Sequence, residues 1–436
     1  MVKPRHAVST VKFIDSYCEL YKDLFVEVRA YECFKYLHQG LISEIKRKSL
    51  PEIAKIVGLE NEQGLHHFLT NSPWSAKELE ARRLTIILNL LEGRAIDVII
   101  DETGDKKKGK KTDYVKRQYI GNLGKIENGI VSVNAYGHLE GITFPLKFKI
   151  FKPKGRLKPT DEYKSKPVLG AEIITELQEI GFKINRVLAD SLYGESNSNF
   201  LSVIEQLGIE YAVAIRCNHG VWLPKSEKVR ANKWREFEHH RWDGKIEKRY
   251  IREVIYGKRR AKQYWEITTD ADTVPPESTW FVMTKIEQVK YYEVGQIYQV
   301  RGWVEYGFKQ SKSELGWADF RVTHYPQIEK WWQLVMSAYL MVSVHSEILN
   351  PFLVPVEEKF TEHDWWNQST GWKNLLNNLR LILQPFTSFN LMKQWLKVFP
   401  IPQLSWGFLR LICLMNKFDC LRYLVYFWDD SFYSSA

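Results

Sequence analysis

Two short apolar runs that each end in an aspartate constrain this chain most. Residues 95–103 (AIDVIIDET) are rich in β-branched side chains, and residues 185–190 (NRVLAD) form a second such run. Runs of this kind fill central, buried strands. Side chains at the carboxyl ends of such strands converge on one edge of an α/β sheet. We therefore expect Asp101 and Asp190 to end two strands of one mixed sheet, although either residue alone could simply cap a turn.

The elements around these runs follow an α/β order. Two further strands are expected at 130–138 and 143–151, joined by a hairpin near Glu140 and Gly141. A helix at 166–180 closed by Gly181, the second aspartate strand, a helix at 197–206 and a strand at 211–216 follow. This order predicts a ribonuclease-H-like core, although other mixed sheets could produce it.

The rest of the chain divides into three further regions. Residues 1–92 have helical periodicity, and residues 49–72 resemble a helix-turn-helix. There, Ser49 and Glu52 could form a capping box, and 62–70 would be the second helix. Such a helix pair either reads DNA or binds nothing. We expect a helical DNA-binding domain (1–92), a catalytic domain (93–217 and 296–349), a basic, mostly β insertion (218–295) and a helical, Trp-rich C-terminal region (350–436).

Charge and cysteine usage limit the class of protein. The net charge is +10 and the pI about 9.1, so a polyanionic partner is plausible. The 5 cysteines include no CxxC pair, which argues against a disulfide scaffold or a zinc site. Neither a secretory signal nor a membrane span is expected. These features predict a cytoplasmic protein.

A third cluster of polar residues lies within YQVRGWVEYGFKQSK. Tyr298, Arg301, Glu305 and Lys312 are spaced at i, i+3, i+7 and i+14, which would place them on one narrow stripe of a continuous helix. A helical pattern is expected to resume at Gln299 and to run to Leu315. The stripe is either a solvated helix face or a functional one. In the functional interpretation Glu305 reaches a metal ion, while Arg301 and Lys312 bind phosphates.

Three carboxylates suit phosphodiester chemistry. Cleavage needs an activated nucleophile and a stabilised leaving oxygen, and a pair of metal ions about 3.5–4 Å apart supplies both. Mg²⁺ prefers hard oxygen ligands. We therefore expect Asp101, Asp190 and Glu305 to be the catalytic, metal-binding residues.

The sequence resembles the DDE transposases of bacterial insertion sequences, in the branch marked by Tyr-x2-Arg-x3-Glu-x6-Lys. Tyr298, Arg301, Glu305 and Lys312 match that signature, and DVIIDETGDKKKGKKT and VLADSLYGE resemble the branch's two aspartate blocks. The resemblance covers roughly residues 30–350. It implies a ribonuclease-H-like fold interrupted by a β insertion.

The resemblance also implies an activity. Two Mg²⁺ ions, with Mn²⁺ as a substitute, would serve cleavage of terminal inverted repeats through a DNA hairpin and the joining of the cut ends to target DNA. Tyr298, Arg301 and Lys312 would grip phosphates of the cut end. Joining two ends implies at least a homodimer on double-stranded DNA, in a bacterial cytoplasm and on the nucleoid when bound.

Further DNA contacts are expected outside this signature. Trp280 is a candidate for stacking on a displaced base, although a buried strand Trp is the commoner role. Basic residues in the loop after Asp101 and in the insertion would bind the DNA backbone, chiefly Lys106, Lys107, Lys108, Lys110, Lys111, Arg249, Arg259 and Arg260.

Three alternatives to an active transposase remain. A catalytically inactive, domesticated DNA-binding derivative would not need the carboxylates. A ribonuclease-H-fold nuclease would need neither the helix-turn-helix nor the additional basic residues near Glu305. A helical scaffold protein would leave the three carboxylates unexplained.

Overall fold

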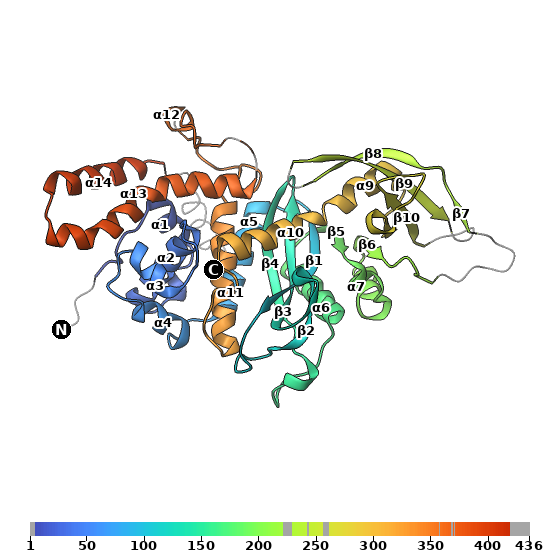
Figure 1. Cartoon of the computed structure of the whole chain (residues 1–436), viewed down its shortest axis with the longest axis horizontal. Coiled ribbons are helices and arrows are strands. Elements are labelled where there is room, and N and C mark those ends of the chain that lie inside the picture. Colours follow the sequence, from blue (N-terminus) through green and yellow to red (C-terminus); the bar gives the residue numbers. More distant parts are fainter. Residues whose placement is uncertain are drawn as a thin grey trace, which may run out of the picture.

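The computed structural model describes residues 5–220, 229–241, 244–255, 261–356, 358–367, 369 and 371–418. A large mixed sheet occupies the middle of the molecule (Figure 1). Helices from both ends of the chain lie together on one side of it, and the insertion lies on the opposite side. The prediction of an α/β fold with helical ends is confirmed.

The central strands have the order β4-β3-β1-β5-β6, formed by Ile142–Ile150, Lys125–Leu139, Ile96–Lys106, Ile184–Ala189 and Glu210–Ile215. β1 is antiparallel to β3 and parallel to β5, and β5 is parallel to β6. The β-branched core of β1, from Ile96 to Ile100, is buried apart from Asp97, as expected for a covered strand. Three antiparallel strands followed by parallel ones are consistent with a ribonuclease-H-like sheet.

The first aspartate strand is longer than predicted. β1 continues past Asp101 to Lys106, so Asp101 lies in mid-strand and the expectation that it ends the strand was wrong. The continuation is paired with β3, which in turn pairs with β2 (Lys116–Ile120), a strand that the sequence did not predict. The predicted hairpin is confirmed, with φ of 47° at Glu140 and 86° at Gly141.

The crossovers place helices near the two aspartate strands. α6 (Lys166–Ile180) has the predicted bounds and ends at Gly181, where φ is 109°. A short helix that the sequence did not predict, α7 (Ser191–Gly194), directly follows Asp190. The helix predicted at 197–206 is interrupted, because Asn197–Leu201 forms a π turn before α8 (Ser202–Gln206).

Five helices and a 3₁₀ turn (Lys22–Leu24) form the N-terminal region, as predicted: α1 (Lys12–Glu19), α2 (Val28–Ile42), α3 (Leu50–Ile56), α4 (Gln63–Thr70) and α5 (Ala76–Leu91). The pair α3–α4 coincides with the predicted helix-turn-helix. Ser49 occupies the N-cap of α3, but its side chain makes no capping hydrogen bond, so the predicted capping box was wrong.

The insertion is mostly β, as predicted, and it extends the central sheet. Its strands are β7 (Arg230–Ala231), β8 (Arg235–His240), β9 (Ile246–Ile255), β10 (Gln263–Thr268) and β11 (Trp280–Lys285). β11 pairs antiparallel with β6, so the insertion continues the central sheet rather than forming a separate body. The sequence pattern did not predict this continuity.

The helical pattern after the insertion begins earlier than predicted. α9 (Tyr291–Gln299) precedes α10 (Gly302–Lys309), and Gln310–Glu314 forms a π turn. Between the helices the hydrogen bonds shorten to i→i+3, as from the Arg301 amide to the Tyr298 carbonyl. The expected single helix from Gln299 to Leu315 was therefore wrong, and the signature residues do not share one regular stripe.

The last helices are α11 (Tyr325–Ser343), α12 (Glu358–Thr361), α13 (Trp372–Val398) and α14 (Pro402–Met415). They bear out a helical C-terminal region as far as the structure describes it. α13 packs on the N-terminal helices, where the Asn390 side chain donates to the Ile56 carbonyl at 3.0 Å. In the described part of the chain, no helix is long and apolar enough to cross a membrane.

α11 joins the helical side to the sheet. It is buried along most of its length between α5 and β4. Trp317 and Trp332 stack at 4.7 Å between ring centroids, so much of the Trp content forms core. Arg83 of α5 is fully buried and donates to the carbonyls of Pro145 and Leu146 on β4. This arginine links the N-terminal helices to the central sheet.

Candidate active site

The two predicted aspartates lie together on neighbouring parallel strands. Asp101 is on β1, and Asp190 follows β5 directly. Asp190 caps α7 by accepting a hydrogen bond from the Leu192 amide at 2.9 Å. Because β1 and β5 pair in register from Asp97 to Ile100, the two carboxylates are held at the same level of the sheet.

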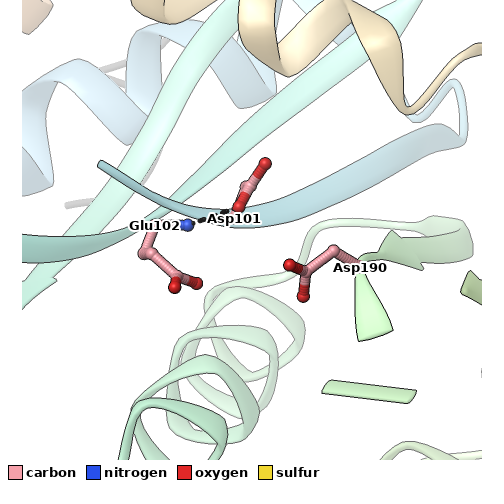
Figure 2. A group of neighbouring side chains, drawn as sticks. All are labelled: Asp101, Glu102 and Asp190. Atoms are coloured by element: carbon pink, nitrogen blue, oxygen red, sulfur yellow. Dashed lines mark hydrogen bonds between the residues drawn. The ribbon is translucent and has the colours of Figure 1, made fainter. Parts of the chain in front are cut away.

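A third carboxylate, which the sequence interpretation missed, completes this cluster. Oxygens of Asp101, Glu102 and Asp190 all lie within 4.8 Å of one another. Figure 2 shows the side chains of Asp101 and Glu102 leaving β1 on opposite sides, with Asp190 on the same side of the ribbon as Glu102. Successive side chains of a strand point to opposite faces of the sheet, so the sequence pattern does not predict that Glu102 shares a site with Asp101. No sequence signal besides its adjacency to Asp101 could have identified it.

The donor set fits a divalent metal ion. All three residues offer hard carboxylate oxygens, the ligands that Mg²⁺ and Mn²⁺ prefer. Glu102 is already engaged, since it accepts from the Lys166 ammonium at 2.9 Å and from the Tyr193 hydroxyl at 3.4 Å. Asp101 has a longer ion pair, 3.4 Å from Arg301, and Asp190 accepts from the Leu192 backbone amide, so neither is held by a cation as closely as Glu102 is.

Burial and neighbouring negative charges disfavour the ionised form of Asp101 when no metal ion is bound. The pKa of Asp101 is raised to about 7, chiefly by burial; Arg301 opposes this rise, and the neighbouring Asp190 and Glu102 contribute to it. Proximity of carboxylates in a dry site favours a bound cation that would neutralise them. The electrostatics thus agree with a metal-binding role.

Arg301 connects Asp101 to Glu305. Its guanidinium lies 3.4 Å from Asp101 and 3.6 Å from Glu305, between the two predicted ligands. Among the described residues, Glu305 is not part of the cluster within 4.8 Å, and 59% of its side chain is exposed. Burial opposes the charge on Arg301, but the nearby acids, Asp101 above all, raise its pKa overall. The structure thus places Glu305 beside the cluster rather than within it.

Tyr298 and Trp280 lie together at the end of α9. Their ring centroids are 6.0 Å apart, and Tyr298 is buried. The guanidinium of Arg249 covers the Trp280 ring at 4.0 Å and pairs with Glu247 at 2.9 Å. In this structure Arg249 is a buried support for Trp280 rather than an exposed phosphate contact. Arg259 and Arg260 lie outside the described residues.

Lys312 reaches β1 from the π turn. Its ammonium donates to the Gly104 carbonyl at 2.8 Å and lies 3.1 Å from the Asp105 carboxylate. The lysine therefore points along the continuation of β1 beyond Asp101. To bind a phosphate as predicted, it would have to leave Asp105.

The basic loop after β1 is only partly free. Lys107 donates to the Ala318 carbonyl and lies 3.4 Å from the centroid of the Phe320 ring. Burial lowers the pKa of Lys107 to about 8. Lys106 ends β1 and pairs with Glu127 at 3.2 Å. The loop residues with exposed side chains and the greatest freedom are Lys108, Lys110 and Lys111.

Replacing Lys108, Lys110 and Lys111 by Ala together should weaken binding to any duplex. The slope of log affinity against log salt should fall by up to about 2.7, or roughly 0.9 for each lost phosphate contact. Binding titrations at several salt concentrations measure this slope. Lys107→Ala is the matched control and should leave the slope unchanged, because its ammonium is held by Phe320. An unchanged slope in the triple variant would show that the loop is only solvated.

Comparison with known proteins identifies the family of this chain. A model of the DDE superfamily endonucleases matches residues 23–267, a range that includes Asp101 and Asp190 but ends before Glu305. The chain belongs to the DDE superfamily of endonucleases. It is 58% identical over 329 residues to a protein of Microchaete diplosiphon called "Probable transposase for insertion sequence element IS701". The match covers 76% of this chain and 87% of that protein, and it assigns the chain to the insertion-sequence transposases.

Proposed function

We propose that this transposase cleaves the ends of its insertion sequence at the terminal inverted repeats and joins them to target DNA. The observation that carries the proposal is the convergence of Asp101 and Asp190 from two parallel strands, next to Arg301 and Glu305. This combines metal ligands with a cation suited to a phosphate in one site.

Asp101 and Asp190 would hold the metal, and Glu305 would join them as the third ligand. The exposed side chain of Glu305 has room to turn once Arg301 exchanges its carboxylate partners for a DNA phosphate. Two Mg²⁺ ions, or Mn²⁺ in their place, would supply an activated nucleophile and stabilise the leaving oxygen. Glu102, paired with Lys166, would position Asp101 from the neighbouring position on β1.

The reaction would proceed in successive exchanges at phosphorus, each of which forms one P–O bond and breaks another. Water would attack the phosphodiester at the element's end and release a 3′-hydroxyl. That hydroxyl would attack the opposite strand, which closes a hairpin and releases the 3′-hydroxyl of the flanking DNA. A second water would reopen the hairpin and regenerate the element's 3′-hydroxyl, which would then attack the target strand and release a target 3′-hydroxyl. Arg301, Tyr298 and Lys312 would hold phosphates of the cut end, and Trp280 would stack on a displaced base if Arg249 moved aside.

Recognition of the two ends would involve other parts of the chain. The exposed side chains of α4, including Gln63, His66 and His67, are available for reading a repeat. Joining two ends requires two protomers, so we propose a homodimer in the DNA complex.

The test is cleavage of a labelled duplex that carries the inverted repeat flanking the gene. With Mg²⁺ or Mn²⁺ we expect a cut at the repeat end, visible on a denaturing gel, together with a hairpin product. EDTA should abolish both products, and a scrambled repeat should not be cut. Binding to the repeat without cleavage under either metal would favour the inactive DNA-binding alternative.

A further inference from the structure

The hairpin between β2 and β3 exposes apolar side chains where a solvated turn would carry polar ones. Tyr119 is 56% exposed, Leu123 40% and Ile126 58%. Tyr119 and Ile126 are cross-strand partners, so their side chains share one face at the end of the hairpin. Leu123 lies in the turn that connects the two strands. Clustered apolar side chains on an exposed hairpin mark a contact surface.

The end of this hairpin is firmly anchored to the catalytic sheet. Ile120 is fully buried, and it packs where Gly104 of β1 and Gly129 of β3 have no side chains. The Gln118 amide donates to the Gly129 carbonyl at 2.9 Å. Alternation along β2 thus directs Ile120 into the core and Tyr119 outward. Because the hairpin is fixed to the sheet, its exposed side chains can press on a bound partner without being displaced.

Basic side chains surround the apolar residues. Arg117 is exposed, and Lys106 and Lys125 share a single acid, Glu127. Lys116 lies beside the turn at Gly155, where a Cβ would be 3.0 Å from its ammonium. The next residue of that turn, Arg156, donates to the carbonyls of Lys110 and Thr112 and so fixes the lysine loop alongside. Excess positive charge fits a polyanion.

The hairpin is aligned with the proposed active site. β1 runs directly from Asp101 to Lys106, which spans roughly 17 Å at about 3.4 Å per residue. That is about half a turn of a DNA duplex. The end of the hairpin lies beside this part of β1, because Ile120 packs at Gly104, three residues after Asp101. DNA with its reacting phosphate at Asp101 could therefore reach the hairpin with its flanking backbone.

We propose that the β2–β3 hairpin binds the target DNA and inserts Tyr119, Leu123 or Ile126 against a base step to bend it. Proteins that kink DNA use apolar wedges of this kind flanked by basic residues. The proposal rests on the proposed transposase function and assigns target binding to a surface outside the carboxylate site. The hairpin's lysines contact phosphates, which carry no sequence information. Such a surface suits a variable target better than a fixed terminal repeat.

The experiment compares cleavage with joining in the variant Tyr119→Ser/Ile126→Ser. We expect wild-type cleavage of the repeat-bearing duplex but at least about tenfold slower joining of a pre-cut end to a linear target, since bending costs several kcal/mol. A target with a central two-base mismatch bends easily and should restore most of the joining rate. Leu123→Ser provides a second, single-residue variant.

Matched controls keep the result interpretable. Val26→Ser/Ile180→Ser removes exposed apolar side chains elsewhere and should change neither step. Unaltered joining by both hairpin variants, equal losses of cleavage and joining, or a loss that the mismatched target does not relieve would each overturn the proposal. A wild-type protein that neither cleaves nor joins would instead refute the proposed function.

Discussion

Asp101→Asn and Asp190→Asn should each lower the rate of strand cleavage by at least about 10³-fold, equivalent to about 4 kcal/mol of activation free energy. Each substitution keeps the shape of the side chain but removes a carboxylate, the proposed metal ligand, from the cluster within 4.8 Å. Binding to the terminal repeat should change little. Single-turnover cleavage of the labelled duplex, together with a binding titration, measures both quantities.

Asp97→Asn is the matched control for the two aspartates. Asp97 lies on the same strand and pairs with Arg186 at 3.0 Å, away from the metal cluster. We expect nearly normal cleavage from this variant. Retained cleavage in Asp101→Asn or Asp190→Asn would remove that residue from the proposed catalytic site.

The third ligand is decided by comparing Glu305→Gln with Glu102→Gln. Glu305→Gln should abolish cleavage like the aspartate variants, whereas Glu102→Gln should reduce it less, because Glu102 is already paired with Lys166. Glu293→Gln on α9 is a control that should leave the rate intact apart from a small loss of helix stability. A larger loss of cleavage in Glu102→Gln than in Glu305→Gln would identify Glu102 as the third ligand.

The Asp101→Asn variant should also melt at a higher temperature than the wild type when metal is absent and the pH is high. The folded-state pKa of Asp101 is raised to about 7 by burial, against about 4 for a free carboxyl. The contribution of protonated Asp101 to folding stability is complete at a pH below the pKa of a free carboxyl, and it is lost as the pH rises through about 7. Asn stays neutral throughout.

Thermal melting in EDTA at about pH 5 and about pH 8 measures this difference. We expect the variant's advantage only at the higher pH, by a few degrees. Added Mg²⁺ should then stabilise the wild type more than the variant, because ligand binding to the folded state raises its stability. A difference in melting temperature that is independent of pH would contradict the assigned electrostatics.

The second large effect concerns stability rather than activity. Arg83→Ala should lower the free energy of unfolding by about 3–4 kcal/mol, since it leaves the Pro145 and Leu146 carbonyls unpaired and opens a cavity. Arg83→Met keeps much of the packing and should lose less. Denaturant unfolding followed by circular dichroism measures the change.

The neighbouring arginine provides a control. Arg82 pairs with Asp23, whose side chain is 66% exposed, so Arg82→Ala should cost only about 1 kcal/mol. Equal losses in Arg82→Ala and Arg83→Ala would show that burial at the junction of α5, β4 and α11 contributes nothing special.

The sequence predicted the elements that local pattern controls. The β-branched runs before Asp101 and Asp190 form buried strands, and Gly181 ends α6, because side-chain periodicity and backbone preference act over a few residues. The same local reasoning failed at β2 and at the break near Arg301, where pairing with β3 and the packing of α9 and α10 decide the conformation.

By itself, the sequence determined the α/β class and the family, and it singled out Asp101 and Asp190 because each follows a short apolar run. The two residues meet because β1 and β5 pair in parallel, with Ile100 opposite Ala189. Only the tertiary structure decided which other groups meet there. It brought Glu102 into the carboxylate cluster, placed Arg301 between Asp101 and Glu305, and directed Lys312 to β1. These contacts join residues far apart in the chain through strand pairing and helix packing, which a one-dimensional pattern does not encode.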